Sequence, residues 1–240
     1  MKFILIADSI CGGFGQRSGK SFVHYSLIDL GLENSLVDYS CSGMTTTDFL
    51  SKSEIGFILR NIKSSDFVII SLGNVDSKPV YTKNNIFSFF VPRRYRAEKL
   101  DPRPYYSTSR LRRMFEKFDN YLRMISRFFC FYSNNYDRKV SQEVFVANFL
   151  RILDQIDVPR QNIILITPSA IDESLFPGAA DYFAETQDFI EHLGVECGVK
   201  TFDFKTLVTT DDYLLDLFHL NENGHQKVRK NFTTFIKGII

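Results

Sequence analysis

Three short segments in the first 76 residues have the pattern of buried strands. Phe3–Ala7 and Phe67–Leu72 are mainly apolar and lack helical spacing, and Ser35–Tyr39 is a shorter segment of the same kind. Continuous apolar runs of this length are typical of strands that are buried on both faces of a parallel sheet. Each segment ends in polar or small residues, which indicates that the chain turns there.

Segments with helical spacing separate these strands. The first carries apolar residues from Phe22 to Leu30 and stops at Gly31. The second carries them over residues 49–62, and Thr46 or Thr47 is placed to cap it. Strands that alternate with helices in this way predict a parallel sheet with right-handed crossovers.

The same alternation returns in the last hundred residues. Residues 144–156 and 177–193 have helical patterns, and a further helix follows Gly224. Strands are predicted at Asn162–Thr167 and Val199–Phe202. We therefore expect a single domain of 240 residues with a three-layer, flavodoxin-like α/β fold and a five-stranded parallel sheet.

Residues 78–139 interrupt this alternation. Prolines at positions 92, 102 and 104 exclude a long helix from the first part of the segment. From about Ser109, apolar residues recur at helical spacing on one face, namely Leu111, Met114, Phe115, Phe118, Leu122, Ile125 and Phe129. We predict that an inserted, mainly helical subdomain occupies about 78–139.

The insertion is also strongly basic. It holds 15 Lys and Arg against 5 Asp and Glu, so it carries +10 while the rest of the chain carries −9 of the net charge of +1. The overall content of 44% hydrophobic and 24% charged residues is ordinary for a globular protein. The four cysteines lack metal-ligand spacing, so we expect reduced thiols, no metal and no cofactor.

Residues with reactive or hydrogen-bonding groups follow the predicted strands. Ser9 follows the first strand, Gly43 the second and Asn74 the third, while Asp216 and His219 follow the last. The carboxyl ends of parallel strands meet at one edge of the sheet, where open α/β sheets bind ligands. We therefore expect these four blocks to converge on one site, in which an imidazole can activate a serine hydroxyl.

The four blocks resemble those of the SGNH hydrolases, the GDSL-type esterase family, and in particular its bacterial members from surface-polysaccharide pathways. The matching segments are Ala7-Asp8-Ser9-Ile10, Ser42-Gly43, Gly73-Asn74-Val75-Asp76 and Asp216-Leu217-Phe218-His219. The resemblance covers residues 1–76 and 140–240 and leaves the insertion unexplained.

This resemblance implies a role for each block. Ser9 would be the nucleophile, His219 its general base, and Asp216 the carboxylate that orients the imidazole. The backbone N–H groups of Ser9 and Gly43 and the side-chain amide of Asn74 would form the oxyanion hole.

Neighbouring positions qualify this assignment. Asp8 and Asp76 lie within the matching segments and are candidates for substrate contact. Ala7 stands where the family usually has glycine. Alanine is tolerated at this position if its φ is negative. The asparagine that often precedes the second-block glycine is absent, and Ser40 and Ser42 are the candidates to replace it.

The basic insertion has three interpretations. In the first, its apolar stripe packs inward and its basic residues form a solvated face. In the second, it recognises an acidic substrate through guanidinium groups, for which the candidates are Arg93, Arg94, Arg96 and Arg103. In the third, it docks on an anionic membrane surface. We expect no nucleic-acid partner, because no recognised binding motif accompanies the charge.

The reaction expected from the resemblance is hydrolysis of a small acyl ester, first of all an O-acetyl ester, on a carbohydrate. The substrate would be a small acylated molecule, with acidic carbohydrates among the candidates. Two alternatives stay open, namely an O-acyltransferase that uses the same site and a non-catalytic protein that binds acidic glycans on this scaffold. The oligomeric state is left open.

The cellular compartment is predicted from apolar segments. None approaches the roughly 20 residues that a membrane span needs. The apolar run after Lys2 is shorter than the roughly 7–15 residues of a signal-peptide core. We therefore expect a cytoplasmic protein.

Overall fold

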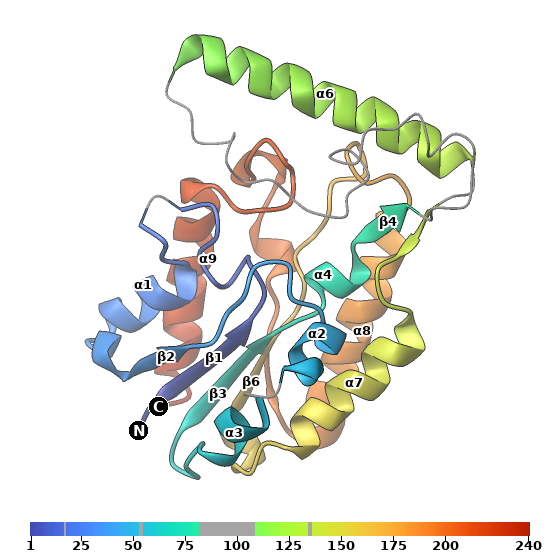
Figure 1. The fold of residues 1–240 in the computed structure, drawn as a ribbon. Coiled ribbons are helices and arrows are strands. Elements are labelled where there is room, and N and C mark those ends of the chain that lie inside the picture. Colours follow the sequence, from blue (N-terminus) through green and yellow to red (C-terminus); the bar gives the residue numbers. More distant parts are fainter. Residues whose placement is uncertain (17, 53–54, 82–108, 134–135) are drawn as a thin grey trace.

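Five parallel strands form the centre of the protein in a computed structural model, which describes residues 1–16, 18–52, 55–81, 109–133 and 136–240. The strands are β1 (Phe3–Ala7), β2 (Leu36–Asp38), β3 (Phe67–Ser71), β6 (Ile163–Ile166) and β7 (Lys200–Phe202). They lie in the order β2-β1-β3-β6-β7 (Figure 1), which is the strand order of flavodoxin-like sheets. The predicted five-stranded parallel α/β fold is confirmed.

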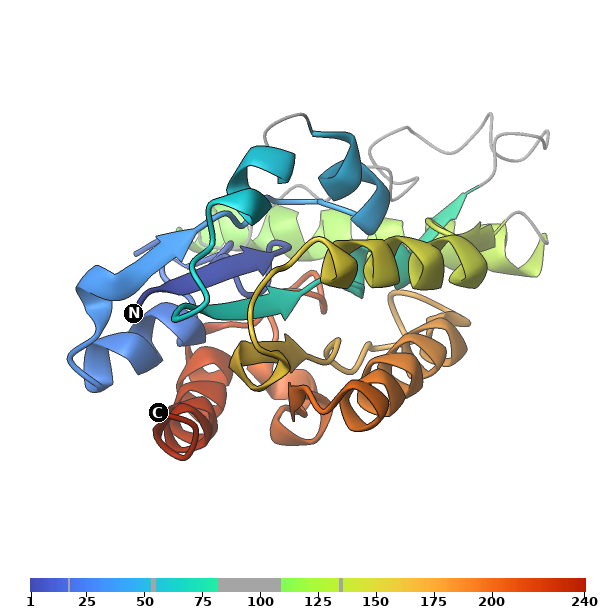
Figure 2. The ribbon, with the colours of Figure 1, turned by 90° about the horizontal axis from the view of Figure 1, so that it is seen from below.

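Helices cover both faces of the sheet (Figure 2). One face packs against α1 (Phe22–Asp29) and α9 (Glu222–Lys237). The other packs against α2 (Thr46–Ser51), α3 (Ile55–Arg60) and α7 (Gln142–Asp154). Helix α8 (Ala179–Cys197) contributes side chains to both apolar clusters. The result is the three-layer arrangement that the alternation of strands and helices predicts.

Strand β1 is apolar at every position because both of its faces are covered. Phe3, Leu5 and Ala7 belong to the apolar cluster on one face of the sheet, and Ile4 and Ile6 belong to the cluster on the other. Successive side chains of a strand point to opposite faces, so a strand covered on both sides needs an apolar residue at each position.

The carboxyl ends of β1 and β3 lie level with each other. Ala7 pairs with Ser71 in the ladder, and the next N–H, that of Asp8, donates to the Ser71 carbonyl oxygen at 3.0 Å. Helix α4 (Asn74–Ser77) begins three residues after β3 ends. This register sets the turn that follows β1 beside the first turn of α4.

The helix predicted over 49–62 is two shorter helices, α2 and α3, and its cap is Thr45 instead of Thr46 or Thr47. The Thr45 hydroxyl accepts the Asp48 N–H at 3.0 Å, and the Asp48 carboxylate accepts the Thr45 N–H at 3.1 Å. This capping box requires an acid three residues after the threonine, a spacing that selects Thr45. Helix α2 ends where Lys52 adopts extended backbone.

The insertion contains a pair of strands that the sequence pattern did not indicate. Strand β4 (Pro79–Tyr81) pairs antiparallel with β5 (Tyr136–Arg138) at the two ends of the insertion. Between them lies α6 (Arg110–Tyr132), which the helical spacing predicted. That residues 78–139 as a whole form an inserted subdomain stays a prediction.

Short 3-10 helices cover Glu33–Ser35, Arg160–Asn162, Lys205–Leu207 and Thr210–Asp212.

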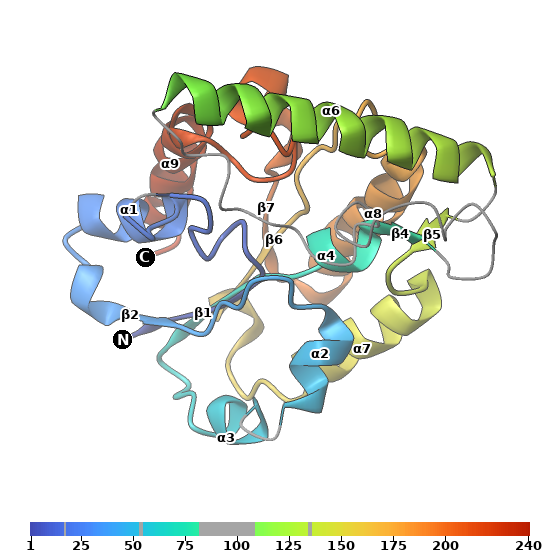
Figure 3. The same cartoon turned by 45° about the horizontal axis from the view of Figure 1, so that its top comes forward.

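Helix α6 crosses the carboxyl edge of the sheet (Figures 1 and 3), and its orientation contradicts the first interpretation of the insertion. The apolar stripe faces outward, with Phe115 and Phe129 about two-thirds exposed, whereas Arg123 and Arg127 are buried. The polar side packs inward because the Arg127 guanidinium donates to the Leu175 carbonyl oxygen at 3.2 Å and lies over the Phe176 ring. In the part of the chain that the structure describes, no helix is long and apolar enough to cross a membrane.

Candidate active site

Ser9 lies in a tight turn at the carboxyl end of β1. The Gly12 N–H donates to the Asp8 carbonyl oxygen at 3.1 Å, and the Phe14 N–H donates to the Ser9 carbonyl oxygen at 3.0 Å. Gly13 has φ +75°, and a Cβ there would lie 2.6 Å from the backbone of the Lys20–Ser21 peptide. Glycine is therefore required at this turn. Ala7 has a negative φ, as its substitution for glycine requires.

The Asp216–His219 segment meets this turn from the other end of the chain. The His219 Nε2 atom lies 2.9 Å from the Ser9 hydroxyl oxygen, and its Nδ1 atom lies 2.6 Å from an Asp216 carboxylate oxygen. Leu217 has φ +50°, the one positive value outside glycine among the described residues. Such a backbone conformation is strained for leucine and tends to occur at functional sites. The structure thus brings together the hydroxyl, imidazole and carboxylate that the sequence predicts to converge.

The environment of Asp216 favours its charged form. Burial acts to raise the pKa of this carboxyl, but the charge and hydrogen bond of His219 outweigh it, so the pKa lies below its ordinary value. The other carboxylate oxygen accepts the N–H groups of Phe218 and His219 at 3.1 and 3.0 Å. An ionised Asp216 fixes the imidazole with Nε2 toward Ser9.

Asn74 is held at both ends of its side-chain amide. Its Nδ2 donates to Asp8 at 3.0 Å, and its Oδ1 accepts the Ser169 N–H at 3.1 Å. The residue before it, Gly73, has φ +121°, and a Cβ there would approach Thr186 to 2.9 Å. The conformation and the lack of space both exclude a larger residue at this position.

The carboxylate of Asp8 is buried and contacts other groups of the protein. It is fully buried, and burial raises its pKa to about 6 although the Asn74 amide and the Ile10 N–H act in the other direction. One oxygen accepts the Ile10 N–H at 3.1 Å and the other accepts the Asn74 amide. The carboxylate is thus committed to holding Asn74, which does not fit the predicted substrate contact.

Asp76 is likewise committed to a protein contact. Its side chain is fully buried and accepts the Thr46 N–H at 2.9 Å and the Thr46 hydroxyl at 2.6 Å. Burial is the main cause that raises the pKa of this carboxyl above its ordinary value. Asp76 therefore anchors the start of α2, and this contact does not fit the predicted role of Asp76 in substrate contact.

Gly43 lies in the turn after β2, beside the end of β1. The Cys41 N–H donates to the Ala7 carbonyl oxygen at 2.9 Å, which ties this turn to the strand that carries Ser9. Gly43 has φ +73° and open space where a Cβ would stand. Its carbonyl oxygen accepts a hydrogen bond from the Lys139 ammonium at 3.4 Å. Glycine is needed here for its backbone conformation.

Two residues near the site were missed from the sequence. Ser169, which holds Asn74, comes three residues after β6, so the rule that polar residues follow strands could have found it. Lys78 is buried, and burial together with the charges of Arg127 and Lys139 lowers its pKa to about 7, while Asp216 acts to raise it. Nothing in the sequence marks Lys78 as a buried cation.

Other predicted features lie elsewhere. Arg93, Arg94, Arg96 and Arg103 lie outside the residues that the structure describes. Within the described ranges, no group of three or more His, Cys, Asp and Glu side chains could hold a metal ion. Cys11, Cys41, Cys130 and Cys197 form no disulfide bonds with one another.

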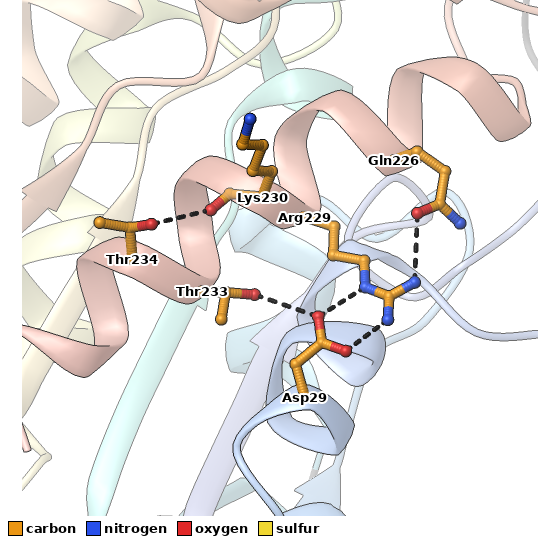
Figure 4. A pocket seen from close by; sticks show the side chains of 6 residues that line it. All are labelled: Asp29, Gln226, Arg229, Lys230, Thr233 and Thr234. Atoms are coloured by element: carbon orange, nitrogen blue, oxygen red, sulfur yellow. Dashed lines mark hydrogen bonds and ion pairs between the residues drawn. The ribbon is translucent and has the colours of Figure 1, made fainter.

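A groove on the outside of the molecule is separate from this site. It lies along α9 next to the end of α1 and is lined by Asp29, Gln226, Arg229, Lys230, Thr233 and Thr234 (Figure 4). The Arg229 guanidinium forms a two-pronged ion pair with Asp29, and its Nη1 also contacts Gln226 at 3.1 Å. Arg229, Asp29 and Gln226 thus satisfy one another within the groove.

Known structures share this arrangement of strands and helices. A lipase/acylhydrolase from Enterococcus faecalis is 17% identical, with a TM-score of 0.60 over 99% of this chain and 95% of its own. The chain has the fold of the GDSL-type hydrolases. A GDSL-like lipase from Bacteroides thetaiotaomicron is 12% identical, with a TM-score of 0.54 over 100% of this chain and 89% of its own.

A carbohydrate acetylesterase from Sinorhizobium meliloti also has this hydrolase fold. It is 14% identical, with a TM-score of 0.58 over 100% of both chains. No protein-family model matches the sequence, and no curated protein matches it significantly. The similarity to GDSL-type hydrolases that four short sequence blocks indicate therefore extends to the fold of the whole chain.

Proposed function

We propose that the protein is a serine esterase that removes a small acyl group, first of all acetyl, from a carbohydrate. The observation that carries this proposal is the 2.9 Å contact between the Ser9 hydroxyl and His219 Nε2, continued by the 2.6 Å contact between His219 Nδ1 and Asp216. A hydroxyl, an imidazole and a carboxylate in this order are the groups that acyl transfer through serine requires.

The reaction proceeds through an acyl-enzyme on Ser9. The Ser9 oxygen attacks the acyl carbon while its proton passes to His219 Nε2, and the leaving alcohol then takes that proton from His219. Water repeats the sequence on the acyl-enzyme: it gives a proton to His219, attacks the acyl carbon and releases the free acid as Ser9 recovers its proton. Asp216 stabilises the imidazolium that forms in each half.

The negative oxygen of each tetrahedral intermediate is assigned to three donors, the N–H groups of Ser9 and Gly43 and the second N–H of the Asn74 amide. Asn74 is suited to this task because Asp8 and Ser169 fix its orientation before substrate binds. A donor fixed in advance needs no reorganisation in the transition state, and losing one typically costs about 3–4 kcal/mol.

The carbohydrate part of the proposal rests on the fold. One of the structures that share it is a carbohydrate acetylesterase. An acidic sugar would suit the basic insertion, with Arg93, Arg94, Arg96 and Arg103 as its candidate contacts. A role on surface polysaccharides belongs to the same proposal.

The test is esterase activity on p-nitrophenyl acetate together with labelling by a fluorophosphonate. We expect the wild type to turn over, Ser9 to be the residue labelled in mass spectrometry, and Ser9→Ala to lose both activity and label. Ser174→Ala, which changes an exposed serine elsewhere, is the matched control. Turnover that persists in Ser9→Ala, or a label on another serine, would remove Ser9 from the mechanism.

Acyl transfer to a sugar is the second candidate function, and the burial of the catalytic side chains favours it. Ser9 is 3% exposed and His219 1% exposed, so little of either side chain is open to bulk water. An alcohol acceptor held in the site then competes with water. Supplying p-nitrophenyl acetate with candidate sugars and measuring the ratio of sugar ester to free acetate separates the two reactions. A folded protein that binds acidic glycans but takes no fluorophosphonate label would instead be a binding protein.

A further inference from the structure

Helix α6 presents an apolar face to solvent along its whole length. Eight large apolar side chains on this outer face are each at least half exposed, namely Leu111, Met114, Phe115, Phe118, Tyr121, Phe128, Phe129 and Tyr132. A single exposed apolar residue is ordinary, but a contiguous set of this size marks an interaction surface.

The outer face is one continuous surface because of its spacing. Its members lie three, four or seven residues apart from Leu111 to Tyr132, which places them on one side of a helix. The helix has 23 residues and therefore spans about 34 Å. Figure 3 shows α6 lying lengthwise across the molecule.

The charges beside the outer face have one sign. Within α6, which is described from end to end, the exposed charged residues are all basic: Arg110, Arg112, Arg113 and Lys117. The two acidic residues of the helix are turned toward the body: Glu116 is 6% exposed and pairs with Arg112 at 3.5 Å, and Asp119 pairs with the buried Arg123 at 2.9 Å. The surface that α6 offers is therefore apolar along its length and positive at its N-terminal half.

We propose that the outer face of α6 binds the surface of an anionic lipid bilayer. An apolar face bordered by arginine and lysine is the composition of a helix that lies in the plane of a membrane interface, and each basic residue near an anionic surface adds about 1 kcal/mol of attraction. A second copy of this chain is the poorer partner, because its α6 would offer the same positive charges and no exposed acid.

The position of α6 determines which side of the protein faces a membrane that is bound through the outer face. The helix crosses the carboxyl edge of the sheet (Figure 1). The Ser9 turn follows the carboxyl end of β1 and therefore lies at the same edge. Binding through the outer face therefore turns that edge toward the membrane. The inference concerns a lipid surface and does not depend on the proposed esterase activity.

The chain contains no tryptophan, so one introduced residue becomes its only tryptophan fluorophore. In Phe118→Trp we expect a blue-shifted and stronger emission on adding vesicles of phosphatidylcholine with 30% phosphatidylglycerol. Pure phosphatidylcholine vesicles should bind at least about tenfold more weakly. Val195→Trp, which places the probe at an 83% exposed position on α8, is the matched control and should not shift. An unshifted spectrum of Phe118→Trp, or equal binding to both kinds of vesicle, would overturn the proposal.

Charge and apolar variants test the two halves of the surface in the same vesicle-sedimentation assay. Phe129→Asp and Lys117→Glu should each reduce binding to the anionic vesicles by about tenfold or more, with far-UV circular dichroism unchanged. Val195→Asp should bind as the wild type does. A dimer that forms without lipid and is separated by Phe129→Asp would show that a second copy covers the face, and would overturn the lipid proposal.

Discussion

Helices α7 and α6 have the same kind of sequence pattern and opposite orientations. In α7 the apolar residues Phe145, Phe149 and Ile152 are fully buried against the sheet and α8, whereas in α6 the apolar residues face solvent. The periodic pattern indicates in both cases that one face is apolar. It does not indicate whether the partner that covers this face lies within the same chain.

The contacts on the opposite side explain the difference. Helix α7 has a mixed solvent side, where the charged Glu143, Arg151 and Asp154 lie beside the partly exposed Val144 and Leu150. Its next strand, β6, begins nine residues after its end. Helix α6 instead meets the body through charged side chains, among which Arg127 contacts Leu175 and Phe176. A buried guanidinium that has such partners is tolerated, so the polar side of a helix can be its inner side.

The largest expected effect is on catalysis at the candidate active site, where Ser9, His219 and Asp216 each depend on the neighbouring side chain. Asp216→Asn should lower kcat on p-nitrophenyl acetate by about 10³–10⁴-fold, because an amide at this position no longer fixes the imidazole with Nε2 ready to accept the Ser9 proton. Steady-state kinetics on folded protein measure this. Phe118→Asp on α6 is the control and should keep full turnover on this soluble ester. A loss below tenfold in Asp216→Asn would break the assignment of Asp216.

The comparison between the two helices is tested most directly by one substitution made in each. Phe149→Ala in α7 should lower the free energy of unfolding by about 3–5 kcal/mol, because it leaves a cavity in the core. Phe118→Ala in α6 should change it by less than about 0.5 kcal/mol, because Phe118 is 62% exposed. Urea denaturation of both variants gives the two values. Equal losses would mean that the outer face of α6 is packed in solution.

Much of the site was accessible from the sequence because it follows from strand ends. Ser9, Asn74 and His219 were found because each comes after a predicted strand, and the parallel register then brings them to one edge. Ser169 follows β6, the fourth strand of the parallel sheet in chain order, so the same rule applies to it. The detailed roles of Asp8 and Asp76 were not accessible, since the sequence does not tell whether a carboxylate beside a nucleophile meets substrate or a protein N–H.

The fold was predicted where each element has a local cause and was missed where the cause is distant. The strand β1 is identified by its own apolar residues. The two strands β4 and β5 lie more than 50 residues apart and have three residues each, so neither has a recognisable pattern. The inward side of α6 depends on Arg127 finding a carbonyl oxygen 48 residues away, at Leu175.

The next largest effect concerns a buried charge of the body, Asp8. Its pKa of about 6 lies above its ordinary value of 3.8, so between these values the folded protein holds a proton that the unfolded chain has released. The stability that Asp8 contributes is therefore present below pH 3.8 and is lost as the pH rises through 6. Asp8→Asn cannot ionise, so from pH 4 to 7 the wild type should lose about 2 kcal/mol of unfolding free energy relative to this variant.

Urea denaturation of both proteins at pH 4, 5.5 and 7 measures this difference. The titration of Asp216, which has the opposite sign, is common to both proteins and cancels. Asp181→Asn removes an exposed carboxylate on α8 and accounts for the change in net charge. A wild-type-to-variant difference that stays constant with pH would mean that Asp8 is not buried as a carboxylate.

The smallest effect tests whether the helices of the body, unlike α6, are held by their apolar faces. Helix α9 packs on α1 through buried residues such as Val228 and Phe232, and the Arg229–Asp29 ion pair lies at the rim of this contact (Figure 4). Both side chains are about one-third exposed, so a double-mutant cycle with Arg229→Met and Asp29→Asn should give a coupling free energy of about 0.5–1 kcal/mol. This coupling should weaken in 1 M NaCl, because salt screens exposed pairs. A coupling of 3 kcal/mol that salt leaves unchanged would mean that polar contacts also hold α9, and the contrast with α6 would then be one of degree only.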